Sequence, residues 1–140
     1  MELREVLRGD KHQWDGNTPI SPVDLADLVV WSPALLPTEY LDLLRLSNGG
    51  HASLAGYPSY ARIWPARAVI EYNRVYEIQQ CVPGFVGFGD DGGEVLIGFD
   101  TRHDSPYPIR AVPFTPMEWS SAIDVADDFH EFIGRMLQRG

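Results

Sequence analysis

Residues 85–99 read FVGFGDDGGEVLIGF. Two short apolar runs flank a turn made of two aspartates and two glycines, Asp90 to Gly93. Aspartate and glycine supply the backbone conformations that tight hairpin turns require. Val95, Ile97 and Phe99 alternate with their neighbours and are expected to share one face of a strand. The stretch therefore predicts a β-hairpin.

Helix signals precede this hairpin. Ser21 can cap a helix and Pro22 suits its first position, so we expect a helix that runs to about Trp31. A second helix is expected from about residue 37 to an Asn-Gly-Gly sequence, and Pro65 opens a third over 66–80. Their predicted buried residues follow helical spacing: Leu36, Tyr40, Leu43 and Leu44 in the second helix, Val69, Tyr72 and Tyr76 in the third. Residues 60–64 alternate as a short strand.

Downstream of the hairpin, a further strand is expected over 107–114. Pro108 and Pro113 place it at a sheet edge or near a bulge. A closing helix over 124–138 carries an apolar stripe of Val125, Phe129, Phe132, Ile133, Met136 and Leu137.

The order of these elements predicts the fold class. The strands cluster late in the chain and are joined by short turns, which indicates a largely antiparallel or mixed sheet flanked by helices. We expect a single α+β domain over residues 21–140. Residues 1–20 form an N-terminal arm, either a lead-in strand or a loose tail. The length of 140 residues is that of one domain.

Charge and cysteine content limit the function classes. The formal net charge is -9, which argues against nucleic acid and anionic membranes as partners. The segment from Asp90 to Gly140 holds ten acidic residues and four arginines, and so carries most of that charge. Cys81 is the single cysteine, so no intramolecular disulfide can form. Neither a signal peptide nor a membrane span is indicated, and the expected location is the cytoplasm.

Three segments together resemble the SUKH superfamily, also called the Smi/Knr family. The first runs from Leu36 to Leu44 and on to Asn48-Gly49-Gly50, and the second from Pro83 to Arg102 through the hairpin. The third is the closing amphipathic helix around Phe129-His130-Glu131-Phe132-Ile133. The resemblance implies an α+β domain that acts by binding rather than by catalysis. In bacteria it implies an immunity protein that neutralises a secreted polymorphic toxin, often a nuclease, and in other members a scaffold in cell-wall and signalling control.

The acidic residues are candidates for the surface that binds a basic toxin domain. From charge alone, a solvated face that keeps the protein soluble is the simpler interpretation. With the resemblance added, a partner-binding surface is favoured, because complementary charge speeds association and selects partners. Tyrosine and tryptophan near loops are typical interface anchors, whereas for each of them alone a place in or at the edge of the core is the simpler interpretation. The candidate partner-binding residues are Asp90, Asp91, Glu94, Asp100, Asp104, Tyr57, Tyr60, Trp64 and Tyr107.

Catalytic and metal chemistry are the weaker alternatives. The hairpin acids with Asp100, His103 and Asp104 could be read as a metal site, which would suggest a metal-dependent hydrolase. The turn lacks the alternating ligand spacing of a calcium loop, so a backbone-driven turn is favoured. Cys81 lies at the C-terminal end of a predicted helix, where the helix dipole does not favour the thiolate that a nucleophilic cysteine needs. We therefore expect no enzymatic activity and no cofactor.

Overall fold

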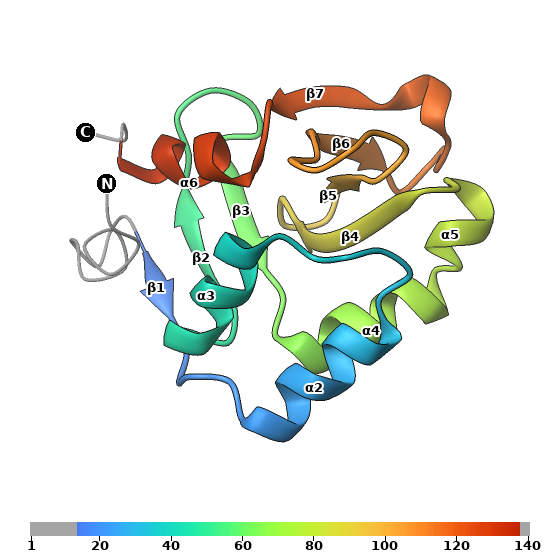
Figure 1. Ribbon diagram of the computed structural model, residues 1–140. Coiled ribbons are helices and arrows are strands. Elements are labelled where there is room, and N and C mark those ends of the chain that lie inside the picture. The colour runs from blue at the N-terminus through green and yellow to red at the C-terminus, as the bar shows by residue number, and fades with distance from the viewer. Residues whose placement is uncertain (1–13, 138–140) are drawn as a thin grey trace.

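A computed structural model describes residues 14–137 of the chain. The elements in chain order are β1 (Asp15–Gly16), α2 (Pro22–Trp31), α3 (Thr38–Leu46), β2 (Gly50–Ser53), β3 (Tyr60–Ile63), α4 (Ala66–Val75), α5 (Ile78–Cys81), β4 (Phe85–Asp90), β5 (Val95–Asp100), β6 (Ile109–Pro113), the 3-10 helix η1 (Trp119–Ser121), β7 (Ile123–Ala126) and α6 (Phe129–Leu137). The strands form one seven-stranded sheet whose spatial order follows the chain, and every neighbouring pair is antiparallel (Figure 1). The predicted α+β class and the single domain with a largely antiparallel sheet are confirmed.

The predicted hairpin is formed by β4 and β5, and all residues of both strands are buried. Asp90 still belongs to the strand and lies opposite Leu96, so the turn begins at Asp91. One carboxylate oxygen of Asp91 accepts the backbone N–H groups of Glu94 and Val95, both at 2.9 Å. Gly92 adopts φ +106°, a conformation that side chains disfavour. The turn therefore needs the Asp-Gly sequence for its own geometry.

Helix α2 begins and ends where the sequence predicts. The Ser21 hydroxyl accepts the Asp24 backbone N–H at 3.1 Å, which satisfies one of the free donors of the first turn. Helix α3 likewise buries the predicted residues Tyr40, Leu43 and Leu44. Both helices carry these signals within their own sequence, which is why local reasoning finds them.

The predicted helix over 66–80 is wrong in one respect, because two helices occupy it. Glu77 has φ +53°, and this left-handed residue separates α4 from α5. The buried side chain of Asn73 donates to Gly87 O at 2.9 Å and accepts the Gly87 N–H at 3.1 Å. Gln79 donates to Asn73 Oδ1 at 2.9 Å. This network ties both helices to β4, and Tyr76 at the break is 41% exposed instead of buried.

The prediction for the last segment also needs correction. Residues 124–126 belong to strand β7, and the helix starts only at Phe129. Strand β7 pairs with β6 through Ala126 opposite Ile109, so β6 is not an edge strand. The register does shift between Ile109 and Arg110, as the prediction of a nearby bulge requires. Pairing with β6 outweighs the helical spacing of the apolar residues here.

The N-terminal arm joins the sheet where the structure describes it. Strand β1 pairs with β2, a strand that the sequence did not predict. Trp14 is 5% exposed and belongs to the core. Of the two alternatives for the arm, the lead-in strand is present at residues 15–16. Residues 1–13 lie outside the described part of the chain. The domain boundary after residue 20 stays a prediction.

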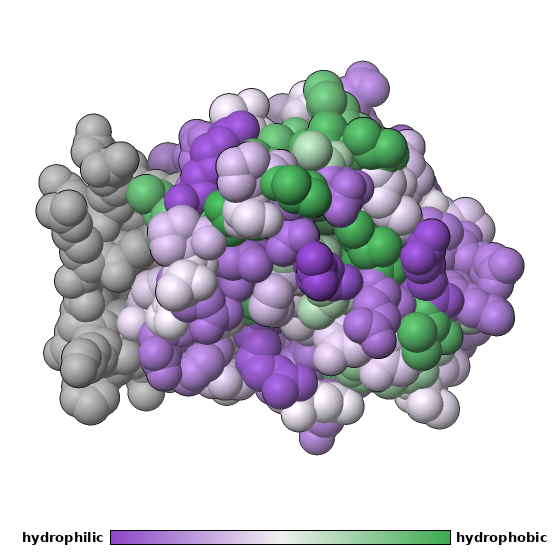
Figure 2. Space-filling view, turned by 90° about the horizontal axis from the view of Figure 1, so that it is seen from below, coloured by the Kyte–Doolittle hydropathy of each residue, from purple (hydrophilic) through white to green (hydrophobic). Residues whose placement is uncertain are grey.

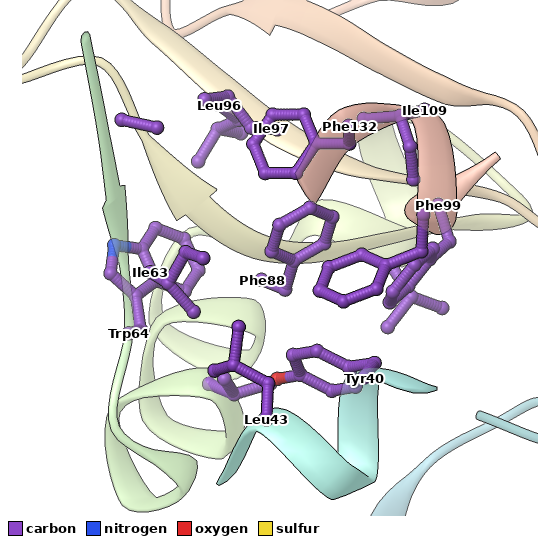
Figure 3. Packing of buried hydrophobic residues seen from close by; sticks show 14 of the residues in the cluster. Tyr40, Leu43, Ile63, Trp64, Phe88, Leu96, Ile97, Phe99, Ile109 and Phe132 are labelled. Carbon is purple, nitrogen blue, oxygen red and sulfur yellow. The ribbon is translucent and has the colours of Figure 1, made fainter. Parts of the chain in front are cut away.

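The two faces of the sheet are covered by different helices. Helices α4 and α5 contact β4 on one face, and α2 packs against α4 (Figure 1). Phe88 points to the other face, where its ring centroid lies 5.6 Å from Tyr40 on α3 and 5.6 Å from Phe132 on α6. Figure 3 shows this aromatic core, with Phe99 4.6 Å from Phe88. The hairpin β4–β5 is thus enclosed on both faces, and its ends are its accessible parts.

The helical face seen from below in Figure 2 carries exposed apolar residues. Val23 and Val30 on α2 are 67% and 85% exposed. In the space-filling view the apolar areas are interrupted by hydrophilic residues (Figure 2). Scattered exposure of this kind is common on protein surfaces and gives no reason to place the functional site here.

Candidate functional site: the tip of the central hairpin

The hairpin tip gathers six of the nine candidate residues. Asp90, Asp91 and Glu94 come from the end of β4 and the turn. Tyr60 begins β3, the neighbouring strand, and a Cβ atom on Gly92 would lie 3.9 Å from the Tyr60 ring. Trp64 directly follows β3 and is only 4% exposed, so its ring belongs to the core. Burial raises the pKa of Tyr57, and the nearby charges of Asp91 and Glu94 raise it further. Tyr57 therefore lies within electrostatic reach of the same turn.

Asp90 is 4% exposed and is held entirely by internal donors. Arg62 donates to both carboxylate oxygens, from Nε at 2.8 Å and Nη2 at 3.1 Å. The Trp64 indole N–H donates at 2.8 Å, and so does the backbone N–H of Gly92. The expectation that Asp90 presents an acid to a partner is corrected: its carboxylate orients Arg62 and Trp64 and fixes the turn.

Two adjoining hollows flank this Arg62–Asp90 ion pair. One has a volume of about 240 Å³ and is lined by His51, Pro65 and Ala68 among others. The second, of about 220 Å³, is lined by Tyr76, Gly93 and Phe114 on its far side. Both share the walls Arg62, Asp90, Trp64 and Tyr72. The tip is therefore concave on the side of α4.

A row of four aromatic rings, which we call the aromatic row, lines these hollows. It runs from Trp64 to Tyr72 at 4.9 Å between ring centroids, on to Tyr76 at 5.8 Å and then to Phe114 at 5.4 Å. Tyr72, Tyr76 and Phe114 were not among the site residues predicted from the sequence. Tyr72 and Tyr76 are four residues apart, a spacing that places two side chains on one helix face. The prediction took that face to be buried.

Two carboxylates of the tip remain available to a partner. Glu94 is exposed, and Asp91 is half-buried while its Oδ1 atom holds the turn. Within residues 14–137, neither of them forms a salt bridge with an arginine, a lysine or a histidine. Glu94 also lies beside the aromatic row, since its carbonyl accepts the Phe114 backbone N–H at 3.1 Å.

The loop that carries Tyr57 is held by an arginine that the sequence did not indicate. Arg135 on α6 donates to the carbonyls of Ala55 at 2.6 Å, Tyr57 at 2.7 Å and Val125 at 2.7 Å. Burial lowers the pKa of Arg135, and the charge of Glu131 partly offsets this effect. The guanidinium thus anchors the Tyr57 loop to α6 and β7.

The opposite end of the hairpin holds a second buried carboxylate. Asp100 is fully buried and accepts from Arg102 Nη2 and Arg110 Nε, both at 2.9 Å. Burial raises the pKa of Asp100, but the hydrogen bonds from the two arginines outweigh it and lower the pKa to about 2. Arg110 also pairs with the exposed Asp124. Asp100, like Asp90, is therefore neutralised internally and not a surface acid.

The remaining two candidates belong to that opposite end. Asp104 is exposed in the loop after β5. Tyr107 is 8% exposed, and its hydroxyl donates to Leu35 O at 2.8 Å, so it serves the core. The strands β4 and β5 are six residues long, which separates the two ends by about 17 Å. The nine residues therefore do not form one surface.

Neither a metal-binding cluster nor a membrane-spanning helix is found among the described residues. Across 14–137, no group of three or more histidine, cysteine, aspartate or glutamate side chains is placed to hold a metal ion. No helix in that part of the chain is long and apolar enough to cross a membrane.

Comparison with known proteins assigns the chain to a family. A comparison with curated proteins finds no match. The model of the SMI1 / KNR4 family (SUKH-1) matches residues 19–135, which covers the hairpin, both of its ends and the described helices except the last two residues of α6. The chain therefore belongs to the SMI1 / KNR4 family (SUKH-1).

Proposed function

We propose that the protein is a bacterial immunity protein that binds a basic toxin domain, such as a nuclease, and blocks it without catalysis. The family, which includes immunity proteins, supports this class of function. The binding surface is the hairpin tip: Asp91, Glu94 and Tyr57 at the rim, with Tyr60 and the aromatic row beside them. We place this action in the cytoplasm.

One observation carries the proposal. The tip has two acids that form no salt bridge among residues 14–137, and aromatic rings lie near them. Asp90 and Asp100 have arginine partners, whereas Asp91 and Glu94 have none among residues 14–137. One exposed and one half-buried carboxylate next to half-exposed tyrosines match the composition of protein interfaces, which combine aromatic anchors with a polar rim.

The chemistry of a nuclease gives the reason for an acidic inhibitor. An enzyme that binds a phosphate backbone does so with lysine and arginine. A carboxylate surface competes for those groups and is drawn to them from a distance, which raises the association rate. The net charge of -9 extends this attraction over the whole molecule.

Charge reversal at the tip tests the proposal. Glu94→Lys is the informative variant, because Glu94 is exposed and its side chain holds no described contact. Asp27→Lys on α2 is the matched control, with the same change in charge at another exposed position. The partner is the toxin domain recovered with the protein from its native host, and binding is measured calorimetrically at two salt concentrations.

We expect Glu94→Lys to weaken binding about tenfold or more and to flatten its salt dependence, because interfacial charge pairs couple by more than about 1.4 kcal/mol. Asp27→Lys should change affinity by no more than about twofold. Equal effects of both variants would reject the tip as the binding surface. If the partner is a constitutive cell-wall or signalling enzyme and no toxin, the scaffold function replaces the immunity function.

A further inference from the structure

The structure contains its own example of how this fold holds an arginine. The Arg102 guanidinium lies 3.5 Å from the ring centroid of Trp119 while it donates to Asp100. Stacking on an aromatic face and pairing with a carboxylate together form a strong site for arginine, whose guanidinium is planar and weakly hydrated.

The aromatic row offers the same two elements at the other end of the hairpin. Tyr76 is 41% exposed, Phe114 is half-buried, and both line the 220 Å³ hollow beside Gly93. The turn acids Asp91 and Glu94 flank the pair Gly92-Gly93 in the sequence. Within residues 14–137, no cation lies over any ring of the row. The hollow thus has an aromatic wall, and the turn that carries these two acids forms its edge at Gly93, but no arginine is stacked there.

Arg62 lines the same hollow and must be weighed against a second cation. Its charge is compensated by the bidentate contact with Asp90, and the pair lies beside Trp64, at the first ring of the row. Tyr76 and Phe114 are the third and fourth rings, and Phe114 adjoins Glu94. The Tyr76–Phe114 end of the row is therefore the end that adjoins Glu94, whereas the Arg62–Asp90 pair lies at the Trp64 end.

We propose that the Tyr76–Phe114 end of the aromatic row is an arginine-binding subsite, which takes an arginine side chain of the basic partner. The inference rests on the proposed function for its partner, and it names the chemistry of the contact. The guanidinium stacks on the Tyr76 ring, the aliphatic stem packs on Phe114, and the turn carboxylates supply the opposite charge. A purely apolar side chain would leave those carboxylates unused.

The subsite can be tested without the toxin. The probe is the peptide Ac-Gly-Arg-Gly-NH2, compared with the matched peptides that carry glutamine or leucine in place of arginine. Ring resonances of tyrosine and phenylalanine are followed by NMR during titration at low salt. We expect the arginine peptide to shift Tyr76 and Phe114 at millimolar concentration, and the glutamine and leucine peptides to shift them several-fold less. A leucine peptide that shifts the rings as strongly would overturn the inference.

Variants locate the subsite. Tyr76→Leu should weaken the arginine peptide about two- to fivefold, the range for cation–π contacts at exposed positions. Val75→Ala, the neighbouring residue that is 66% exposed, is the matched control and should have no effect. Glu94→Gln should also weaken the peptide, since it removes a carboxylate and keeps the shape. Unchanged affinity in both Tyr76→Leu and Glu94→Gln would show that the peptide binds elsewhere.

The outcomes separate this inference from the proposed function. If the arginine peptide does not shift the ring resonances of Tyr76 and Phe114 while Glu94→Lys still weakens partner binding, the subsite is wrong and the acidic surface remains supported. If the peptide binds the row but Glu94→Lys leaves partner binding intact, the subsite exists and the proposed function is wrong.

Discussion

The two ends of the central hairpin share a buried aspartate paired with arginine, and they differ in the aromatic rings and acids around that pair. Each strand of the β4–β5 pair ends in a buried aspartate that arginine neutralises, Asp90 with Arg62 and Asp100 with Arg102 and Arg110. At the Asp100 end, Arg102 covers the neighbouring Trp119 ring, so that aromatic and charge are both satisfied inside the molecule. At the Asp90 end, Tyr76 of the aromatic row is 41% exposed, and two further acids, Asp91 and Glu94, form no salt bridge within residues 14–137. We infer that the first end maintains the fold and that the second is available for binding.

This difference shows why acidic residues cannot be counted as one surface. Of the five acidic candidates, two are buried in ion pairs, one holds the turn, and only Glu94 and Asp104 present side chains without a described contact. Net charge describes the field around the protein, whereas the local partners of each carboxylate decide which of them a ligand can meet.

Asp100→Asn is expected to have the largest effect on stability. The amide replaces the charge that two arginines face, and Arg110 is itself only 21% exposed in its side chain. Removing the buried carboxylate that two arginines share costs about 3 kcal/mol or more in the free energy of unfolding, although Arg110 keeps its exposed partner Asp124. Urea denaturation measures the loss, and Asp104→Asn in the loop after β5, expected to stay within about 0.5 kcal/mol, is the control.

Asp90→Asn should cost less, about 2 kcal/mol, because the Arg62 side chain is 52% exposed and water can replace part of the lost interaction. The same variant loses an acceptor of the Trp64 indole N–H, so the NMR resonance of that proton should move. If Asp90→Asn destabilises the protein more than Asp100→Asn, the assignment of the Asp100 end as the structural one is wrong.

Low pH should remove a stabilising contribution of Asp100. The pKa of Asp100 is about 2 in the folded protein, below the ordinary value of 3.8. A carboxylate with a lowered pKa stabilises the fold above its unfolded pKa, and this contribution is lost as pH falls from about 4 towards 2. The difference corresponds to about 2 kcal/mol. Denaturation at pH 5 and pH 2 should show this extra loss in the wild type and lack it in Asp100→Asn, and an identical loss in both proteins would contradict the assignment.

The smallest expected effects come from two tyrosines near the hairpin. The Tyr40 hydroxyl is buried and has no hydrogen-bond partner within the described residues, and burial raises its pKa. Tyr40→Phe should therefore stabilise the protein by about 1 kcal/mol. Tyr107→Phe removes the hydrogen bond to Leu35 O and should destabilise it by about the same amount. Thermal unfolding measures both, and a loss of stability in Tyr40→Phe would reveal a partner for that hydroxyl.

The sequence predicts those parts of the fold whose signals are local. The Ser21 cap and the Asp-Gly turn each act within a few residues, and the elements they mark are present. Helix α3 ends at Leu46 with an extended residue, Ser47, so it stops shortly before the Asn-Gly-Gly sequence that was expected to end it. The errors lie where distant partners decide. Ala126 pairs with Ile109 and becomes a strand although its neighbours are spaced as in a helix. Asn73 and Gln79 hold the break at Glu77 through contacts that no short sequence window contains.

The candidate site was predicted in part for the same reason. The turn residues Asp91 and Glu94 are adjacent in sequence and were found together. Tyr76 and Phe114 join them only because α4 and β6 fold to one side of the tip. The pairing of Asp90 with Arg62 lies across β3 and β4, and sequence alone could not show that this acid is already neutralised.

The central claim is that the Asp90 end of the hairpin, and not the Asp100 end, is the binding end. Hydrogen–deuterium exchange of the protein, alone and in complex with the partner recovered from its native host, tests this most directly. We predict added protection in the turn 91–94 and in α4 around Tyr72 to Tyr76, with little change in the loop 101–107. Protection confined to the loop 101–107, with the turn and α4 unchanged, would contradict the account.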